Sequence, residues 1–157
     1  MKRILILGGG RSSSNLIQYL LDRAEAEQFE VRLGDADLEL ATAKIGNHSL
    51  GSCFQLDATN TVQRRHEIEH AFLIISMLPA HMHIEVAKDC ITYKKHMVTA
   101  SYISDAMQEL DEAAKENNLI FMNEIGLDPG IDHMSAMKVI HEIEAKGGKM
   151  ILFESFC

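Results

Sequence analysis

The chain has 157 residues, of which 46% are hydrophobic and 24% charged, and its formal net charge is −8. These proportions are typical of a soluble globular domain with a sizeable core, and they exclude an intrinsically disordered chain. Because a net negative charge repels phosphate backbones, nucleic acid is not expected as a partner. No apolar run approaches the roughly 20 residues of a membrane span, so we expect no membrane partner either.

The cysteines are Cys53, Cys90 and Cys157, an odd number without a C-x-x-C pair. Neither a disulfide framework nor a four-thiolate zinc site is indicated, and a reducing compartment fits. The apolar stretch near the N-terminus, residues 4–7, is too short for the core of a signal peptide. The sequence therefore predicts a cytoplasmic protein.

Short apolar runs alternate with longer amphipathic segments along the chain. The apolar runs predict strands at residues 4–7, 30–33, 53–56, 71–76, 97–99, 119–122 and 150–156. The amphipathic segments predict helices at residues 15–26, 37–45, 60–69, 83–92, 105–116 and 131–145. Because each parallel crossover needs a helix between successive strands, the pattern predicts an α/β fold with a Rossmann-type, doubly wound parallel sheet.

A glycine-rich turn, GGGRSS, joins the first predicted strand to the first helix. Gly8 and Gly10 match the first two positions of G-x-G-x-x-G, and Ser13 takes the third, where a small residue suffices for packing. Gly8 permits the tight turn, and Gly10 lets a pyrophosphate approach the backbone. The free amide groups of residues 11–13 and the hydroxyls of Ser12, Ser13 and Ser14 are expected to donate to the phosphates at the helix start, and Arg11 adds a cation. A purely structural turn is the alternative.

Asp35 ends the second predicted strand, roughly 25 residues after Gly10, near the spacing expected for a carboxylate that binds the adenosine ribose. Ala36 and Asp37 follow, so no arginine stands ready for a 2′-phosphate, and a carboxylate opposite that phosphate would repel it. The sequence therefore predicts NAD as cofactor in preference to NADP. Helix capping is the alternative role for Asp35, although Asp37 also suits it.

The segment GLDPGIDH, residues 126–133, is the most unusual in the chain. It predicts a strand exit, an aspartate before proline, a Pro–Gly turn and a helix start. Asp128 is thereby expected on a rigid loop at the carboxyl end of the sheet, where ligands of such folds bind. From the residues alone, a functional carboxylate and a helix N-cap are equally open.

Two histidine patterns are interpreted as structural. Residues 66–70 match H-E-x-x-H, a zinc-protease signature that needs a stable helix, a third ligand and a water-lined cleft. The predicted helix is short and polar, so a surface helix is favoured and no metal site is predicted. His83 follows the motif SMLPA by a few residues, and a surface position is favoured over a contact with the cofactor.

Four motifs together resemble the saccharopine dehydrogenase family, in its glutamate-forming branch, also called saccharopine reductase. They are the glycine turn, SMLPA at residues 76–80, TASY at residues 99–102 and GLDPGIDH. Family members are longer, so the chain resembles an N-terminal portion that lacks most of the substrate domain. The resemblance implies a dinucleotide-binding domain over residues 1–125. It places the GLDPGIDH loop, a helix and the start of the substrate domain in residues 126–157.

The resemblance implies a reversible oxidoreductase reaction on a secondary amine, in lysine metabolism. Saccharopine, NAD(P)⁺ and water are converted to glutamate, α-aminoadipate semialdehyde and NAD(P)H. By motif, the glycine turn holds the pyrophosphate, and the remaining cofactor contacts are Asp35 at the ribose, Asp57 and Ala58 near the adenine, and Leu78 and Pro79 at the nicotinamide ribose. The implied substrate contacts are Ser101, Tyr102 and Asp128, with Asp128 orienting the amine or relaying its proton.

Two alternatives remain open at this point: a related carboxyspermidine-type dehydrogenase, and a nucleotide-binding module without chemistry of its own. A small-molecule amino-acid substrate is the expected partner. The apolar strand predicted at residues 150–156 presents an unpaired edge, which predicts self-association and hence a homo-oligomer. Because half of the cleft is missing, the chain by itself is expected to bind cofactor without turning over saccharopine.

Overall fold

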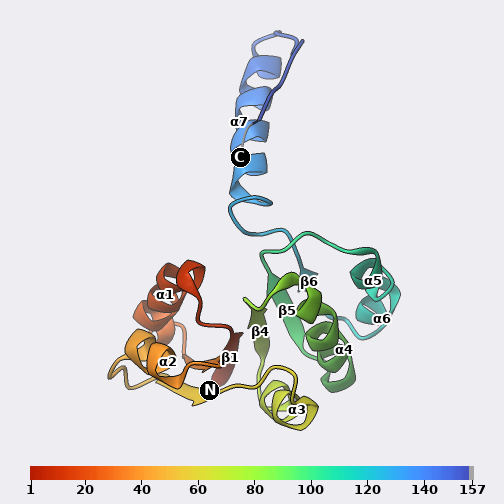
Figure 1. Cartoon of the computed structure of the whole chain (residues 1–157). Coiled ribbons are helices and arrows are strands. Elements are labelled where there is room, and N and C mark those ends of the chain that lie inside the picture. The colour runs from red at the N-terminus through yellow and green to blue at the C-terminus, as the bar shows by residue number, and fades with distance from the viewer. Residues whose placement is uncertain (156–157) are drawn as a thin grey trace.

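The computed structural model describes residues 1–155, and its centre is a six-stranded sheet in the order β3-β2-β1-β4-β5-β6 (Figure 1). All five strand pairs are parallel. The strands are β1 (Lys2–Leu7), β2 (Phe29–Asp35), β3 (Gly51–Gln55), β4 (Leu73–Ser76), β5 (His96–Thr99) and β6 (Phe121–Met122). The strand order reverses between β1 and β4, as in a doubly wound Rossmann-type sheet, so the predicted fold class is confirmed.

Helices connect the strands and cover both faces of the sheet. They are the short η1 (Arg11–Ser13) and η2 (Ala80–Met82), together with α1 (Ser14–Ala24), α2 (Leu38–Ile45), α3 (Thr61–Glu69), α4 (His83–Tyr93), α5 (Asp105–Gln108), α6 (Asp111–Glu116) and α7 (Ile131–Ala145). Successive side chains of β1 point to opposite faces. Ile4 and Ile6 join the core cluster under α1 and α2, whereas Leu5 and Leu7 join the one under α3 and α4.

Side-chain caps begin the helices that follow β2 and β3. The carboxylate of Asp37 accepts a hydrogen bond from Leu40 N at 3.0 Å at the start of α2. Asn60 Oδ1 accepts from Val62 N and Gln63 N, both at 3.1 Å, at the start of α3. Since Asp37 is the cap of α2, the capping alternative for Asp35 is wrong, and its carboxylate has another role.

The structure differs from two predicted elements. The helix predicted at residues 105–116 is two short helices, α5 and α6, because a turn between them packs Leu110 against the core. Residues 150–155 of the strand predicted at 150–156 form no strand, and Phe156 lies outside the described residues. The reason is that α7 extends away from the sheet and carries the following segment with it (Figure 1). The predicted self-association therefore no longer has a strand edge to support it, and it stays a prediction.

No helix within residues 1–155 is long and apolar enough to cross a membrane. Localisation stays a prediction from the sequence.

A buried ion cluster ties α3 to α4. Arg64 Nε lies 2.7 Å from Asp89 Oδ2, and these residues are only 4% and 1% exposed. Arg65 Nε, on a half-exposed side chain, lies 2.7 Å from Asp89 Oδ1. Because a buried charge without its partner is costly, the cluster makes the relative position of the two helices sensitive to the loss of either buried group.

We expect Asp89→Ala to lower the free energy of unfolding by about 3–5 kcal/mol, because it leaves the Arg64 guanidinium buried and unpaired. Arg65→Ala is the matched control, because Arg64 and Asp89 still neutralise each other in that variant. The expected loss for the control is below about 1 kcal/mol. Denaturant unfolding of both variants measures the difference, and equal losses would contradict the assigned asymmetry.

Candidate functional site

A cavity of about 720 Å³ opens at the carboxyl ends of β1, β2, β3 and β4. This is the switch point of the strand order, where doubly wound sheets bind their ligands. Seven residues predicted to contact the cofactor line it: Gly8, Gly10, Asp35, Asp57, Ala58, Leu78 and Pro79. Seven lining residues were not predicted: Ala36, Gln55, Leu56, Thr59, Gln63, Met77 and Met82. The structure thus brings together segments that follow four different strands.

The two motif glycines differ in what they must accommodate. Gly8 has a φ of 104°, a conformation that side chains disfavour, and a Cβ there would lie 2.8 Å from the carbonyl oxygen of Met77. Gly10 has an ordinary φ of −59°, and among the described residues no heavy atom lies within 4 Å of a Cβ built on it. The fold itself requires Gly8, whereas the space beside Gly10 is open to a ligand.

Ser13 turns inward, which agrees with the packing position of the motif but not with its predicted role as a phosphate donor. It is 1% exposed, and both its hydroxyl and its amide donate to Gly10 O, at 2.8 and 3.1 Å. The prediction that these donors are free for phosphates is therefore wrong. Arg11 and Ser12 are exposed and lie outside the lining of the cavity.

Lys44 of α2 forms hydrogen bonds with the glycine turn and the start of α1, a role that the sequence did not predict. Its ammonium group donates to Gly10 O at 2.6 Å, Ser14 Oγ at 2.9 Å and Ser13 Oγ at 3.2 Å. These contacts use the backbone carbonyl of the turn and leave a positive charge beside it. The sequence places this lysine in the last turn of a helix, and nothing there indicates a contact with a turn 34 residues away.

The carboxylate of Asp35 lies in the wall of the cavity at the end of β2. Its Oδ2 accepts a hydrogen bond from Gly9 N at 2.5 Å, and its Oδ1 accepts one from Asp37 N at 2.9 Å. Both oxygens are therefore anchored by backbone amides, one of them in the glycine turn. The contact fixes the distance between the turn after β1 and the end of β2.

Hydrogen bonds also order the loop between β3 and α3. The carboxylate of Asp57 accepts from the hydroxyl and amide of Thr59, at 2.6 and 2.9 Å, and these bonds lower the pKa of Asp57. Gln63 Oε1 accepts from Asp57 N at 2.9 Å, and buried Arg64 donates to Ala58 O at 2.8 Å. The two predicted adenine-side residues thus stand on a loop that is held at several points.

His83 is buried, and the prediction of a surface position is wrong. The residue begins α4, which packs on the sheet, and only 4% of it is exposed. Its Nδ1 lies 2.8 Å from Ser76 Oγ, and its Nε2 lies 2.8 Å from Ser101 Oγ and 3.1 Å from Thr99 Oγ1. Burial lowers the pKa of His83, as does the nearby charge of His81. The imidazole is therefore neutral at neutral pH.

The GLDPGIDH loop closes on itself and presents Asp128 to Tyr102. Gly126 N donates to Pro129 O at 2.9 Å, and Ile131 N donates to Gly126 O at 3.0 Å. The hydroxyl of Tyr102 donates to Asp128 Oδ1 at 2.6 Å. Gly130, not Asp128, occupies the N-cap position of α7, so the capping alternative for Asp128 is wrong.

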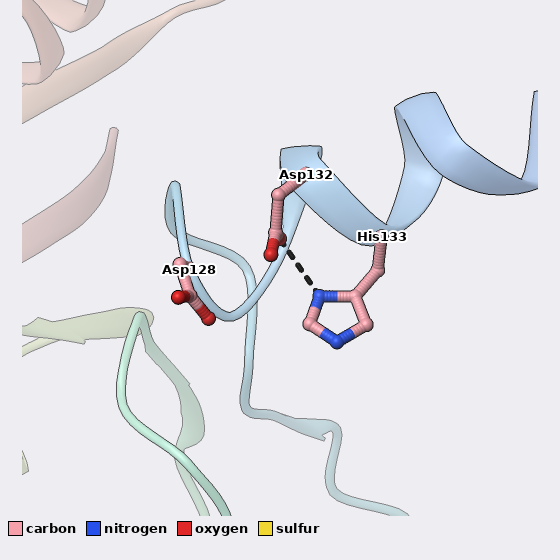
Figure 2. A group of neighbouring side chains, drawn as sticks. All are labelled: Asp128, Asp132 and His133. Atoms are coloured by element: carbon pink, nitrogen blue, oxygen red, sulfur yellow. Dashed lines mark hydrogen bonds and ion pairs between the residues drawn. The ribbon is translucent and has the colours of Figure 1, made fainter. Parts of the chain in front are cut away.

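Asp128, Asp132 and His133 gather at the start of α7 (Figure 2), with one ligand-type atom of each within 4.8 Å of the others. His133 Nδ1 lies 2.7 Å from Asp132 Oδ1, and this hydrogen bond raises the pKa of His133. Burial alone would raise the pKa of Asp132, but the hydrogen bonds from His133 and Gly130 lower it. The group therefore consists of a carboxylate bound by a tyrosine beside a mutually paired acid and base.

The H-E-x-x-H motif lies on α3, away from the cavity lining. His66 and His70 are exposed, and Glu67 is 7% exposed. The carboxylate of Glu67 is engaged by Arg32, whose Nε and Nη2 donate to it at 2.5 and 2.7 Å. This ion pair fastens α3 to β2, which is the structural role of the residue.

The switch-point cavity, the glycine turn and the carboxylate at the end of β2 are the features of a Rossmann-type domain, and in such folds they form the nucleotide-binding crevice. A family model described as the saccharopine dehydrogenase NADP binding domain matches residues 4–122. A second, the saccharopine dehydrogenase C-terminal domain, matches residues 126–157. The chain belongs to the saccharopine dehydrogenase family.

Individual relatives agree with this membership. The chain is 39% identical to saccharopine dehydrogenase [NADP(+), L-glutamate-forming] of Pyricularia oryzae, over 99% of the chain and 34% of that protein. It is 36% identical to alpha-aminoadipic semialdehyde synthase of Arabidopsis thaliana, over 98% of the chain and 16% of that protein. Its fold matches apo saccharopine dehydrogenase (L-Glu forming) from Saccharomyces cerevisiae with a TM-score of 0.83 and 33% identity, over 96% of the chain and 33% of that structure.

The chain spans about a third of the length of the glutamate-forming relatives. Their names, and that of the matching domain, support a nicotinamide dinucleotide as the cofactor class. They point to NADP where the sequence predicted NAD.

We expect Gly10→Ala to weaken binding of the reduced dinucleotide by about tenfold or more, because the added methyl group occupies the space open to a pyrophosphate. Its melting temperature is expected to stay within about 2 °C of the unsubstituted protein, since the methyl group meets no protein atom.

Gly8→Ala is the matched comparison, and it is expected to lower both the melting temperature and the affinity, because of its positive φ and the contact with Met77. Cofactor fluorescence titration and thermal unfolding measure the two quantities. Unchanged affinity of the Gly10→Ala variant would show that no phosphate lies beside this turn.

Proposed function

We propose that the protein, as part of a longer chain, catalyses the reversible NADP-linked oxidation of saccharopine to glutamate and α-aminoadipate semialdehyde. The observation that carries the proposal is the Tyr102–Asp128 hydrogen bond of 2.6 Å. The proposal is supported because this carboxylate follows β6, in the same sheet whose strands β1 to β4 end at the cavity. Membership of the family and the names of its glutamate-forming relatives support the same reaction.

The cofactor would lie across the switch point. Gly8 and Gly10 would admit the pyrophosphate to the backbone, with Ser12 at its open side. On one side of the turn the adenosine would meet Asp35, Asp57 and Ala58; on the other the nicotinamide ribose would meet Leu78 and Pro79. The cofactor supplies the acceptor of the hydride, and the protein orients the carbon that gives it up.

In the oxidative direction, the carbon beside the secondary amine of saccharopine loses a hydride, and the nitrogen loses a proton as the C–N bond becomes an imine. Asp128 would accept or relay this proton, with Tyr102 holding its carboxylate in place. Water then adds to the imine carbon, and cleavage of the C–N bond releases glutamate and the semialdehyde. Ser101 would contact the nicotinamide or the substrate.

We propose NADP(H) in place of the NAD that the sequence predicted. The prediction rested on repulsion between Asp35 and a 2′-phosphate, but both oxygens of this carboxylate already accept backbone amides. Arg11 is exposed directly after Gly10, and the ammonium of Lys44 lies at the same turn. Two cations thus lie at the turn whose Gly9 amide anchors this carboxylate, and a phosphate bound by an arginine gains charge-assisted hydrogen bonds.

The division of the chain into residues 1–125 and 126–157 is a further part of this proposal. Helix α7 lies wholly within the described residues, and none of its side chains is buried. The two family models also meet between residues 122 and 126. Residues for substrate binding would come largely from the substrate domain, of which residues 126–157 would be the start. The activity is therefore to be measured on the full-length protein.

We expect Asp128→Asn in the full-length protein to lower kcat for saccharopine oxidation by about 10²-fold or more, because the amide cannot take up the proton. The dissociation constant of NADPH is expected to change less than about threefold, since Asp128 lies outside the lining of the cofactor cavity. Stopped-flow or steady-state absorbance of reduced cofactor measures the rate. Undiminished turnover would remove Asp128 from the reaction.

We expect Arg11→Ala to weaken the binding of NADPH by about tenfold and that of NADH by less than about twofold. The reason is that one charge-assisted hydrogen bond to the 2′-phosphate is worth roughly 1.5–3 kcal/mol. Asp22→Ala, on the exposed side of α1, serves as the control for a change of surface charge. Fluorescence titration with both cofactors decides the preference. Tighter binding of NADH than of NADPH by the unsubstituted protein would restore the original prediction.

A further inference from the structure

The buried imidazole of His83 connects three hydroxyl groups at the nicotinamide half of the sheet. Ser76 ends β4, Thr99 ends β5, and Ser101 follows β5 by two residues. In a Rossmann fold this second half of the sheet receives the nicotinamide mononucleotide part of the cofactor. We propose that His83 is a positioning residue that fixes the hydroxyl of Ser101 and, through it, the carboxamide of the nicotinamide. This inference rests on the proposed function.

The geometry leaves His83 no freedom to rotate. Ser76 and Thr99 are 0% and 2% exposed, so water does not compete for the ring nitrogens. Nδ1 meets one hydroxyl at 2.8 Å, and Nε2 meets two, at 2.8 and 3.1 Å. A ring flip would exchange a nitrogen for a carbon on both sides and leave buried hydroxyls unsatisfied, at a cost of about 1–3 kcal/mol for each.

The position of the proton on the neutral ring determines whether the half-exposed hydroxyl of Ser101 presents a donor or an acceptor outward. A neutral imidazole has one donor and one acceptor nitrogen. When Nδ1 carries the proton, it donates a hydrogen bond to Ser76, and Nε2 accepts a hydrogen bond from the hydroxyl of Ser101, which then presents lone pairs outward. When Nε2 carries the proton, Ser101 can accept it and direct its own hydroxyl outward as a donor.

A nicotinamide carboxamide can use either state of Ser101. Its amino group donates to an accepting hydroxyl, and its carbonyl oxygen accepts from a donating one. In both cases the Ser101 side chain, held by His83, would set the rotation of the nicotinamide ring. It would thereby set the direction in which C4 of the nicotinamide faces the substrate. An orientation effect of this kind acts on the rate of hydride transfer more than on the binding of the adenosine half.

The alternative is that His83 is only a tie between β4, β5 and α4. A tie of that kind would stabilise the domain whether or not Ser101 carries a hydroxyl. A positioning residue, in contrast, acts through Ser101, so its effect disappears when that hydroxyl is removed. A double-mutant cycle between the two residues separates these cases.

The experiment uses the full-length protein with His83→Leu, His83→Gln, Ser101→Ala and the double variant His83→Leu with Ser101→Ala. We expect His83→Leu to lower kcat by about 10–100-fold and the double variant to be no slower than Ser101→Ala alone. His83→Gln, whose amide offers a donor and an acceptor, should recover part of the rate. His81→Gln, at an exposed neighbouring histidine, is the matched control and should leave kcat within about twofold.

A binding measurement provides a second readout that does not need turnover. NADPH is compared with 2′-phospho-ADP-ribose, which lacks the nicotinamide. We expect His83→Leu to weaken the binding of NADPH by about three- to tenfold and His83→Gln to weaken it less. Neither change should affect the binding of 2′-phospho-ADP-ribose, because only the nicotinamide contact is lost. Ser76→Ala, which removes the partner of Nδ1 without touching Ser101, should produce a smaller loss in the same direction.

Two results would overturn the inference. Independent, multiplicative effects of His83→Leu and Ser101→Ala on kcat would show that the residues do not act together. Equal weakening of the binding of NADPH and of 2′-phospho-ADP-ribose would show a general loss of structure. If His83→Leu does not fold, the same comparison is made with His83→Gln. If the unsubstituted protein does not oxidise saccharopine, the proposed function fails, while the binding comparison still decides the role of His83.

Discussion

The close approach of two backbones at Gly8 is the constraint on which the site depends. Gly8 N donates to Gly34 O at 2.8 Å, and the space for its missing side chain is filled by the carbonyl of Met77. The turn after β1 is thereby held against both β2 and the segment that leaves β4. Because the strand order reverses between β1 and β4, this contact also sets the width of the crevice at the switch point.

Polar groups along the carboxyl edge of the sheet are held by hydrogen bonds to other groups of the protein. Within residues 1–155, every buried side-chain nitrogen and oxygen has a hydrogen-bond partner. The carboxylate of Asp35 is anchored by Gly9, the carbonyl of Ala58 by Arg64, and the hydroxyl of Ser101 by His83. A site that is ordered before its ligand arrives loses less conformational entropy on binding, which favours both affinity and orientation.

The fold was predictable because its signals are local. The alternation of strands and helices, the turn at Gly8 and the cap at Asp37 each depend on a few neighbouring residues. The burial of His83 was not predictable, because the hydroxyls that hold it come from β4 and from the segment at the end of β5. The inward turn of Ser13 likewise depends on the geometry of η1. The segment at residues 150–155 had the composition of a strand, but pairing also needs a neighbouring strand. Helix α7 extends away from the sheet, so this segment has no strand of the sheet beside it (Figure 1).

The carboxyl edge of the sheet is connected across three neighbouring strands by side chains that are distant in sequence. His83 links Ser76 at the end of β4 to Ser101 beyond β5. The next links run from the segment after β5 to the segment after β6: Glu124 N donates to Ser101 O at 3.1 Å, Ile103 N donates to Glu124 Oε1 at 3.0 Å, and Tyr102 donates to Asp128.

These links give Ser101 two anchors: its side chain is held by His83 of α4, and its carbonyl by Glu124 in the segment that leads from β6 to the GLDPGIDH loop. A shift of that loop would therefore be transmitted to Ser101 as well as to Asp128. The proposed proton acceptor and the proposed nicotinamide contact are thus positioned by one hydrogen-bonded unit. Hydride and proton must leave adjacent atoms of the same amine, so holding their two contacts in a fixed relation is what the reaction requires of this part of the protein.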